Sequence, residues 1–365
     1  MLYFLSHLKD WFGPFRIFEY VSFRAMAAAL TTFLATLWIG PAVIRMLTRL
    51  KLGQPIRGKE EVHKLAELHG SKKGTPTMGG LMILITWTIA SLLWVKLNNH
   101  FLWIVLIPTL LLGVLGFMDD YLKIKRKTSG GIKSRHKLLW QVLVATAVSV
   151  FLIYYPETRE ASRNLQLPFI KVTVVDMGWA AVVFFGFVIV GSSNAVNLTD
   201  GLDGLASGCA ISAASVFGIF AYLSDHKDFT PYLLLPRAPG VSELAVVCAA
   251  MAGSCLGFLW YNCHPAKVFM GDTGSLAIGG ALAIVAICVN QEFLLAIVGG
   301  VFVMEALSVI LQVGSFKLTG KRIFAMSPLH HHFELKGWNE STVVVRFWIL
   351  GLVFALLGLA TLKLR

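Results

Sequence analysis

Long apolar runs dominate the chain, and most of its polar residues lie between them. These runs lack the period of two of a half-buried strand and the single apolar stripe of a surface helix. Each is about 18–25 residues long, which as a helix is enough to cross the hydrocarbon core of a bilayer. The pattern predicts an all-α polytopic membrane protein with ten transmembrane helices. The expected spans are residues 21–45, 77–97, 101–121, 137–155, 174–193, 204–223, 241–260, 270–290, 293–315 and 341–362.

The composition points in the same direction. Of the 365 residues, 56% are hydrophobic and 14% are charged, and the mean hydropathy is +0.71. Soluble domains carry about 25% charged residues, so the composition excludes an ordinary soluble enzyme and a disordered chain. We expect one integral-membrane domain over residues 1–365. Residues 1–20 mix aromatic and charged side chains, and we expect them to lie at the membrane interface.

The distribution of basic residues predicts the orientation in the membrane. The net charge is +12, with 32 lysines and arginines. Twenty of these lie in or beside the five odd-numbered loops between the predicted spans, and six lie in or beside the four even-numbered loops. Because basic loops stay on the cytoplasmic side, we expect the odd loops to be cytoplasmic and both termini to be periplasmic. The basic excess then reflects topology and anionic lipid rather than a nucleic-acid partner.

The unusual polar motifs are concentrated in the same odd loops, so a bundle could gather them into one active-site cleft on the cytoplasmic face. The segments are KKGTPTMGG at 72–80, FMDDYLK at 117–123, NAVNLTDGLDG at 194–204, NCHPAKVFMGD at 262–272 and HHH at 330–332.

Three aspartates are candidates for acid–base or metal chemistry. Asp119 and Asp120 end a long apolar run, where carboxylates are costly and usually functional. Adjacent acids are natural Mg²⁺ ligands, or one of them can act as a base. Asp272 opens the eighth predicted span, where it could hold Mg²⁺ against a diphosphate. The alternatives are solvated helix-end acids for the pair and a helix cap for Asp272.

The fifth loop presents carboxylates and amides without basic residues. Asn194, Asn197, Asp200 and Asp203 recur at every third position, so a helical stretch would place them on roughly one face. Such a surface suits a nucleotide, a sugar or a metal, and its alternative is a helix cap followed by a turn. Phe269 in the seventh loop could stack on a base or anchor the chain at the interface.

Basic and histidine residues could contact phosphates. Lys72, Lys73, Lys123 and Lys137 could neutralise anionic substrates, although topology alone accounts for most basic loop residues.

Three adjacent histidines point in different directions, so they do not all bind one metal, but one of them could donate to a phosphate. Glu305 lies inside the ninth predicted span and is either functional or hydrogen-bonded within the bundle.

Taken together, these motifs resemble those of the polyprenyl-phosphate N-acetylhexosamine-1-phosphate transferases, over essentially the whole chain. The aspartate motifs are shared across that family, whereas the GTPTMGG and triple-histidine segments are similar to its muramoyl branch. The resemblance rests on GTPTMGG at 74–80, FMDDY at 117–121, NAVNLTDGLDGLA at 194–206, the NxxPAxVFMGD pattern at 262–272 and PLHHHFELKGW at 328–338.

The resemblance implies a reaction, a cofactor and a location. In that reaction undecaprenyl phosphate attacks the β-phosphate of UDP-N-acetylmuramoyl-pentapeptide, UMP leaves, and lipid I forms for peptidoglycan synthesis. The resemblance also implies Mg²⁺, a homodimer and a multi-pass position in the bacterial cytoplasmic (inner) membrane, in contact with membrane lipid.

It further suggests a role for each candidate residue. Asp272 would be the Mg²⁺ ligand, Asp119 would accept the proton of the prenyl phosphate or position it, and Asp120 would support the metal or Lys123. The residues expected at the uridine end are Asn197, Asp200, Asp203, Asn262, Phe269 and Lys72 or Lys73, and Asn194 is a further substrate-binding candidate. The residues expected on phosphate or sugar are Lys137, His330, His331 and His332, with His330 the catalytic candidate among the histidines.

Three alternatives stay open on the sequence. A related UDP-N-acetylglucosamine-1-phosphate transferase shares the aspartate motifs. A transporter would suit ten spans and Glu305, although transporter sites lie near the bilayer midplane between repeated halves, and we identify no repeat. A prenyltransferase acting on carbon or oxygen uses DDxxD pairs, whereas Asp119-Asp120 is followed by Tyr-Leu-Lys. Release of UMP separates these alternatives.

Overall fold

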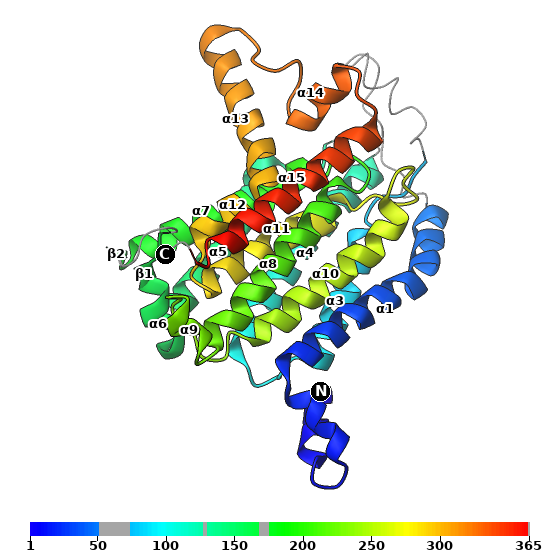
Figure 1. Cartoon of the computed structure of the whole chain (residues 1–365). Coiled ribbons are helices and arrows are strands. Elements are labelled where there is room, and N and C mark those ends of the chain that lie inside the picture. The colour runs from blue at the N-terminus through cyan, green and yellow to red at the C-terminus, as the bar shows by residue number, and fades with distance from the viewer. Residues whose placement is uncertain (51–73, 127–129, 168–174, 364–365) are drawn as a thin grey trace.

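The protein is a bundle of membrane-spanning helices, and its computed structural model describes residues 1–50, 74–126, 130–167 and 175–363 (Figure 1). Within these residues, nine helices are long and apolar enough to cross a bilayer, and a shorter apolar helix, α3 (Gly80–Trp94), accompanies them. The chain is therefore a multi-pass membrane protein. The nine long helices are α1 (Val21–Arg49), α4 (His100–Arg126), α5 (Ser134–Tyr154), α7 (Ala180–Thr199), α8 (Leu205–Asp225), α10 (Glu243–Asn262), α11 (Gly271–Cys288), α13 (Gly300–Thr319) and α15 (Glu340–Ala360).

The predicted span over 77–97 is too long at its start, because α3 begins only at Gly80 and has 15 residues. The residues before α3 run beside the segment that precedes α11 and share backbone hydrogen bonds with it. The N–H of Phe269 donates to Pro76 O at 2.8 Å, and the N–H of Gly79 donates to Phe269 O at 2.8 Å. This long-range pairing takes the place of the first three helical residues that the apolar run predicts.

The predicted span over 293–315 is not one helix. It is divided into α12 (Glu292–Val298) and α13, with Gly299 between them. After this break α13 extends beyond the ends of its neighbours towards α14 (Leu329–Leu335), as Figure 1 shows. A Cβ on Gly299 would lie 2.7 Å from the carbonyl oxygen of Leu295, so a residue without a side chain suits this break.

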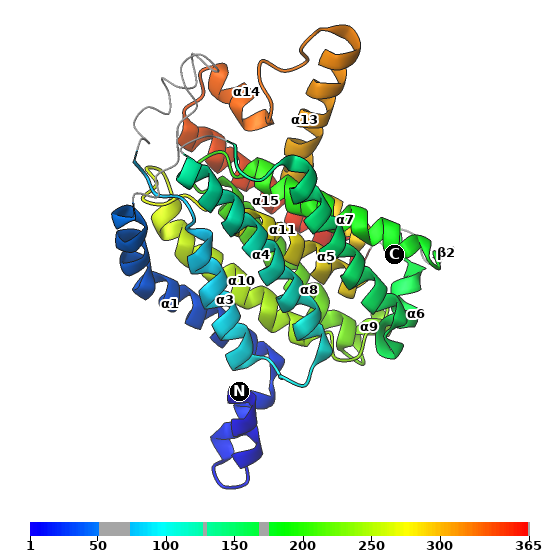
Figure 2. The ribbon, with the colours of Figure 1, turned by 180° about the vertical axis from the view of Figure 1, so that it is seen from behind.

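Helix α11 forms the centre of the bundle, and every residue from Thr273 to Cys288 is buried. Figures 1 and 2 show it enclosed by helices on both sides. Close approach depends on small residues, as is usual between membrane helices. A Cβ on Gly80 would overlap the backbone of Gly274, and a Cβ on Gly116 of α4 would overlap the carbonyl oxygen of Asp272. The fold therefore brings α3 and α4 against the start of α11.

A buried ion pair fastens the bundle near the far end of α3. The guanidinium of Arg24 on α1 donates to both carboxylate oxygens of Glu243 on α10 at 2.7 Å, and to Trp94 O at 3.0 Å. Arg24 is fully buried. Breaking such a pair strands a buried charge, so it fixes how α1, α3 and α10 meet.

Short elements connect the long helices or lie at the end of the bundle away from Gly80. The N-terminal amine of Met1 donates to Leu92 O and Leu93 O near the end of α3. The interfacial position expected for residues 1–20 stays a prediction. The short elements that connect the long helices or lie at that end of the bundle are η1 (Leu2–Leu8), η2 (Gly13–Glu19), α6 (Pro156–Arg163), α9 (Phe229–Tyr232) and the antiparallel pair β1 (Asn164–Leu165) and β2 (Val175–Asp176).

Candidate active site

Three aspartates from two helices meet where α4 ends and α11 begins. One carboxylate oxygen each from Asp119, Asp120 and Asp272 lies within 4.8 Å of the others. Asp119 and Asp120 are almost fully buried, at 3% exposure each. The absence of a side chain at Gly116 allows α4 to approach the first turn of α11, so one glycine makes this meeting possible.

Two lysines neutralise this aspartate cluster. Lys123 Nζ lies 2.6 Å from Asp119 Oδ2, 3.2 Å from Asp272 Oδ2 and 4.0 Å from Asp120 Oδ1. Lys137 Nζ on α5 lies 2.6 Å from Asp272 Oδ2. Asn197 on α7 donates from Nδ2 to Asp272 Oδ1 at 2.8 Å. Three other helices thus contact Asp272, and the lysines offset the repulsion among the carboxylates.

The two adjacent aspartates of α4 have different partners. Asp120 accepts hydrogen bonds at Oδ2 from the N–H of Thr273 at 3.1 Å and from its hydroxyl at 2.8 Å. It therefore caps the start of α11 from another helix, where the helix dipole favours negative charge. Asp119 accepts the N–H of Ile132 at 2.7 Å and makes the short contact to Lys123. Of these two aspartates, Asp119 therefore makes the shorter contact with Lys123.

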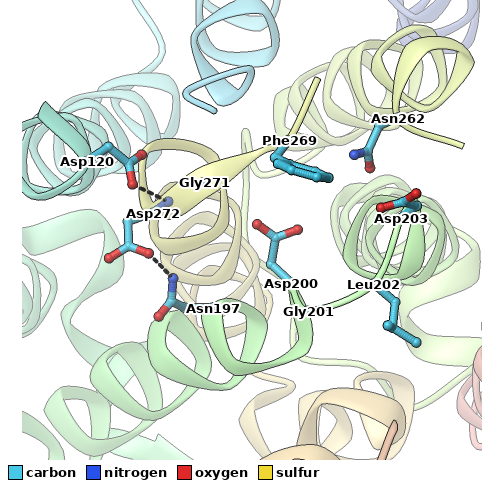
Figure 3. Close-up of a pocket in the computed structure, with 10 residues that line it drawn as sticks. All are labelled: Asp120, Asn197, Asp200, Gly201, Leu202, Asp203, Asn262, Phe269, Gly271 and Asp272. Carbon is cyan, nitrogen blue, oxygen red and sulfur yellow. Dashed lines mark hydrogen bonds between the residues drawn. The ribbon is translucent and has the colours of Figure 1, made fainter. Parts of the chain in front are cut away.

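A polar cavity of about 140 Å³ opens beside the cluster, and Figure 3 shows carboxylates and amides directed into it. Its walls come from the ends of α4, α7 and α10 and from the start of α11. The residues that line it are Asp120, Asn197, Asp200, Gly201, Leu202, Asp203, Asn262, Phe269, Gly271 and Asp272. The structure therefore gathers seven of the predicted site residues around one cavity.

Asp200 follows the last residue of α7 and lies in this cavity. Burial and, to a smaller extent, the negative charges of Asp272 and Asp120 raise the pKa of its carboxyl group to about 8, while a hydrogen bond from the Gly271 N–H opposes the shift. Asp200 is therefore largely protonated at neutral pH until a cation or a hydrogen-bond donor enters the cavity.

The wall around Phe269 is fixed by side chain–backbone hydrogen bonds. Asn262 accepts the N–H of Gly204 at Oδ1 at 3.0 Å and donates from Nδ2 to Val268 O at 2.9 Å. Both ends of its amide thus hold two loops together. Its expected contact with the nucleotide stays a prediction, and its visible role is to hold the loop that carries Phe269.

Glu305 and His330 connect α13 to the cavity. Glu305 is fully buried and accepts the N–H groups of Leu329 at 2.7 Å and His330 at 3.2 Å, so it caps the start of α14. His330 Nδ1 lies 3.2 Å from Glu305 Oε1 but is not aligned for a hydrogen bond. A Cβ on Gly201 would overlap His330 Nε2. The imidazole therefore lies directly behind the cavity wall.

Other predicted site residues are not brought into the cavity. Asn194 donates to Gln141 Oε1 at 3.0 Å, which joins α7 to α5. His331 contacts Glu334 at 2.8 Å, and His332 accepts the Ala325 N–H at 3.1 Å. Partial burial and Lys336 lower the pKa of His332. The expected substrate contacts of these residues stay predictions.

Lys72 and Lys73 lie outside the residues that the structure describes.

Sequence reasoning overlooked several polar residues around the site. Thr273 holds Asp120, and His264 and Glu340 both contact Asp203. Thr273 directly follows Asp272, and His264 lies within the NxxPA pattern, so their positions carried a local signal. Glu340 follows the histidine segment at the start of the last span, and nothing local connects it to Asp203.

The aspartate cluster fits a divalent cation. Mg²⁺ prefers carboxylate oxygens and keeps several waters, so it needs only one or two carboxylates from the protein. Asp119, Asp120 and Asp272 offer such oxygens at mutual distances that one ion can span. Asp120 and Asp272 both line the cavity, and Asp272 is the less buried of the two, so its carboxylate is the more accessible to an ion in the cavity.

Models of known protein families match the chain in two places. The family model described as "Glycosyl transferase family 4" matches residues 102–290, which include the aspartate cluster and all the residues that line the cavity. A signature described as "Phospho-N-acetylmuramoyl-pentapeptide-transferase signature 1" matches residues 72–84.

Curated relatives cover the whole chain. The phospho-N-acetylmuramoyl-pentapeptide-transferases of Methylacidiphilum infernorum and Thermodesulfovibrio yellowstonii are 55% and 52% identical to it, over 100% of both chains. That of Desulfotalea psychrophila is 51% identical, also over 100% of both chains. The chain belongs to glycosyl transferase family 4 and, within it, to the phospho-N-acetylmuramoyl-pentapeptide-transferases. These relatives do not favour the transporter, the prenyltransferase or the N-acetylglucosamine alternative.

Proposed function

We propose that the protein transfers phospho-N-acetylmuramoyl-pentapeptide from its UDP-linked precursor to undecaprenyl phosphate, which forms lipid I and releases UMP in peptidoglycan synthesis. The observation that carries this proposal is the cluster of three aspartates and two lysines beside a polar cavity at one end of a membrane-spanning bundle. The full-length relatives at 51–55% identity support it.

The chemistry requires a site of this kind. An oxygen of the prenyl phosphate bonds to the β-phosphorus, the bond from that phosphorus to the bridging oxygen breaks, and UMP leaves with that oxygen. Because both reactants are anions, catalysis depends on positioning and on neutralising negative charge. Lys123 and Lys137 supply two positive charges within 4 Å of the carboxylates. Asp119, held by Lys123, would accept a proton from the prenyl phosphate or orient it.

Asp272 would hold Mg²⁺, with Asp119 or Asp120 as a second oxygen ligand. When bound, the ion supplies charge neutralisation on the diphosphate. Asp272 occupies the first turn of α11, where the helix dipole also favours an anion.

The cavity suits the nucleotide end of the precursor. Phe269 presents an aromatic ring for stacking, and Asp203 and Asn197 offer hydrogen-bonding groups. His330, behind Gly201, would reach phosphate or sugar through a small shift of the wall. The prenyl chain stays in the lipid, which places the reaction at the membrane interface.

We propose the cytoplasmic membrane as the location, with the cavity on the cytoplasmic face and both termini periplasmic. The distribution of lysine and arginine supports this orientation. A single transferase domain over residues 1–365 and a homodimer belong to the same proposal.

Release of UMP tests the function. The purified protein would be supplied with undecaprenyl phosphate, UDP-N-acetylmuramoyl-pentapeptide and Mg²⁺, beside an EDTA control and Asp272→Asn. The expected result is UMP release that stops with EDTA and falls at least about 100-fold in the variant. Release with UDP-N-acetylglucosamine instead would contradict the substrate assignment. No release from folded protein with either nucleotide would contradict the transferase assignment.

A further inference from the structure

A second group of polar residues lies on the side of the cavity away from the aspartate cluster. Asp203 comes from the turn between α7 and α8, His264 from the loop between α10 and α11, and Glu340 from the first turn of α15. His264 Nδ1 lies 3.1 Å from Asp203 Oδ2 and 3.4 Å from Glu340 Oε2. Segments separated by up to 137 residues therefore meet around one imidazole.

Asp203 is held through both its backbone and its side chain. Its N–H donates to Glu340 Oε1 at 2.9 Å. Its Oδ2 accepts the N–H of Ala266 at 3.1 Å and faces His264. The residue is 3% exposed and lines the cavity. A buried carboxylate with this many partners is restricted in orientation, and that orientation is what a ligand in the cavity meets.

His264 differs from its partners because its side chain is 45% exposed, against 2% for Asp203 and 11% for Glu340. A half-exposed side chain contributes little packing to the fold. Its Nδ1 nevertheless lies between two carboxylates. An N–H at this position donates to Asp203 and offsets the repulsion between the two acids.

The two loops that meet here are already tied by Asn262, which joins Gly204 to Val268. The loops therefore keep their places without His264. What the imidazole adds is a polar contact that directs the Asp203 carboxylate. Removing the imidazole should therefore change ligand binding and leave folding unchanged.

We propose that His264 and Glu340 are positioning residues that act through Asp203 to set the affinity for the pyrimidine nucleotide end of the donor substrate. This inference rests on the proposed function, because it takes a uridine nucleotide as the occupant of the cavity. A carboxylate held beside the ring of Phe269 accepts a hydrogen bond from a ring N–H, which a stacked pyrimidine presents in its plane. Neither positioning residue touches the reacting phosphates.

The test compares His264→Ala with His264→Asn, because the amide of asparagine can place a nitrogen donor near the position of Nδ1. Steady-state UMP release gives kcat and the KM for each substrate, and calorimetry gives the affinity for UMP alone. His226→Ala is the matched control, since His226 Nδ1 lies 4.0 Å from Asp228 Oδ2 in the loop after α8, at the end of the bundle away from the cavity. The melting temperature is recorded for every variant.

The expected result for His264→Ala is a KM for the UDP-linked substrate and a Kd for UMP raised about five- to tenfold, the loss typical of one weakened polar contact. The kcat, the KM for undecaprenyl phosphate and the melting temperature stay within about twofold or a few degrees of wild type. His264→Asn recovers most of the affinity, and His226→Ala resembles wild type. Glu340→Gln should lower the affinity for UMP when it is introduced into wild type. The same substitution should lower the affinity less when it is introduced into His264→Ala, because the two residues act through the same carboxylate.

The inference is overturned if His264→Ala lowers kcat with KM unchanged, if it binds UMP like wild type, or if its affinity and melting temperature fall together without recovery in His264→Asn. Failure of the proposed function gives a different result, because wild type then releases no UMP. In that case the affinity for UMP tests the inference without turnover. An affinity that is lost in His264→Ala and regained in His264→Asn supports the inference. Equal affinities of wild type, His264→Ala and His264→Asn contradict it.

Discussion

Lys137 Nζ on α5 lies 2.6 Å from Asp272 Oδ2 on α11, across 135 residues of sequence. Lys123 Nζ reaches the same oxygen at 3.2 Å. Two cations therefore converge on the carboxylate that faces the cavity. In a site that binds two anionic substrates, these lysines are positioned to neutralise phosphate charge when the substrates arrive.

Lys137→Gln should lower kcat by about 100-fold, because it removes a positive charge beside Asp272, the proposed Mg²⁺ ligand, that would otherwise neutralise phosphate. The Mg²⁺ concentration for half-maximal rate should fall, since Nζ no longer competes for Asp272 Oδ2. Both quantities come from UMP release at saturating substrates. Lys125→Gln is the charge-matched control, because Lys125 is exposed on α4. Normal turnover in Lys137→Gln would contradict the role of this lysine.

Gly116→Ala should separate the aspartates and reduce activity by at least about tenfold, because catalysis is sensitive to displacements of about 1 Å. The new methyl group would overlap the carbonyl oxygen of Asp272 and push α4 away from α11. Gly191→Ala on α7 is the control, since a Cβ there meets no atom of the described residues within 4 Å. Equal activities of the two variants would show that the contact between α4 and α11 does not set the geometry of the cluster.

Asp200 should make the metal-free protein less stable as the pH rises towards 8. Burial raises the pKa of its carboxyl group to about 8, against about 3.9 in the unfolded chain. Between these values the folded state holds more protons than the unfolded state, so the free energy of unfolding falls with increasing pH. Melting temperatures in EDTA should therefore decline from pH 6 to 8 and level off above. Asp200→Asn should lack this component, and parallel curves for the two proteins would contradict the shift.

Glu305→Ala should destabilise the protein, because it leaves the N–H groups of Leu329 and His330 without their buried acceptor. Each unsatisfied group costs about 1–3 kcal/mol, so the melting temperature should drop by several degrees. Glu305→Gln keeps one acceptor oxygen and should lose about half as much. An unchanged melting temperature in Glu305→Ala would show that α14 does not depend on this cap.

Much of the architecture was predictable because membrane spans are long and apolar. The nine long helices fall on nine predicted spans, with shifts of up to seven residues at their ends, and the tenth predicted span is α3. The span predicted over 174–193 was wrong at its start, because β2 occupies Val175–Asp176 and α7 begins only at Ala180. The late start of α3 was not predictable, because it follows from the pairing of Pro76 and Gly79 with Phe269. A local apolar pattern carries no information about such a partner. The break at Gly299 had a weak signal in the pair Gly299-Gly300.

The sequence predicted which residues form the site but not the role that each of them has. The motifs identified Asp119, Asp120 and Asp272, and the structure brings them together. That Asp120 caps α11 from another helix, and that Asn262 uses both ends of its amide on backbone groups, depends on tertiary contacts. Residue type alone cannot separate a side chain that meets a ligand from one that holds the wall around it.

The fate of the β-phosphate distinguishes phospho-sugar transfer to the lipid from hydrolysis or transport of the nucleotide. UDP-N-acetylmuramoyl-pentapeptide labelled with ³²P at the β-phosphate would be incubated with undecaprenyl phosphate, Mg²⁺ and the protein in lipid vesicles. We expect the label to move into the organic-extractable lipid in equal amount to the UMP released, and Asp272→Asn to abolish both. Label that stays in the aqueous phase as inorganic phosphate or UDP, or an intact nucleotide carried across the membrane, would contradict it.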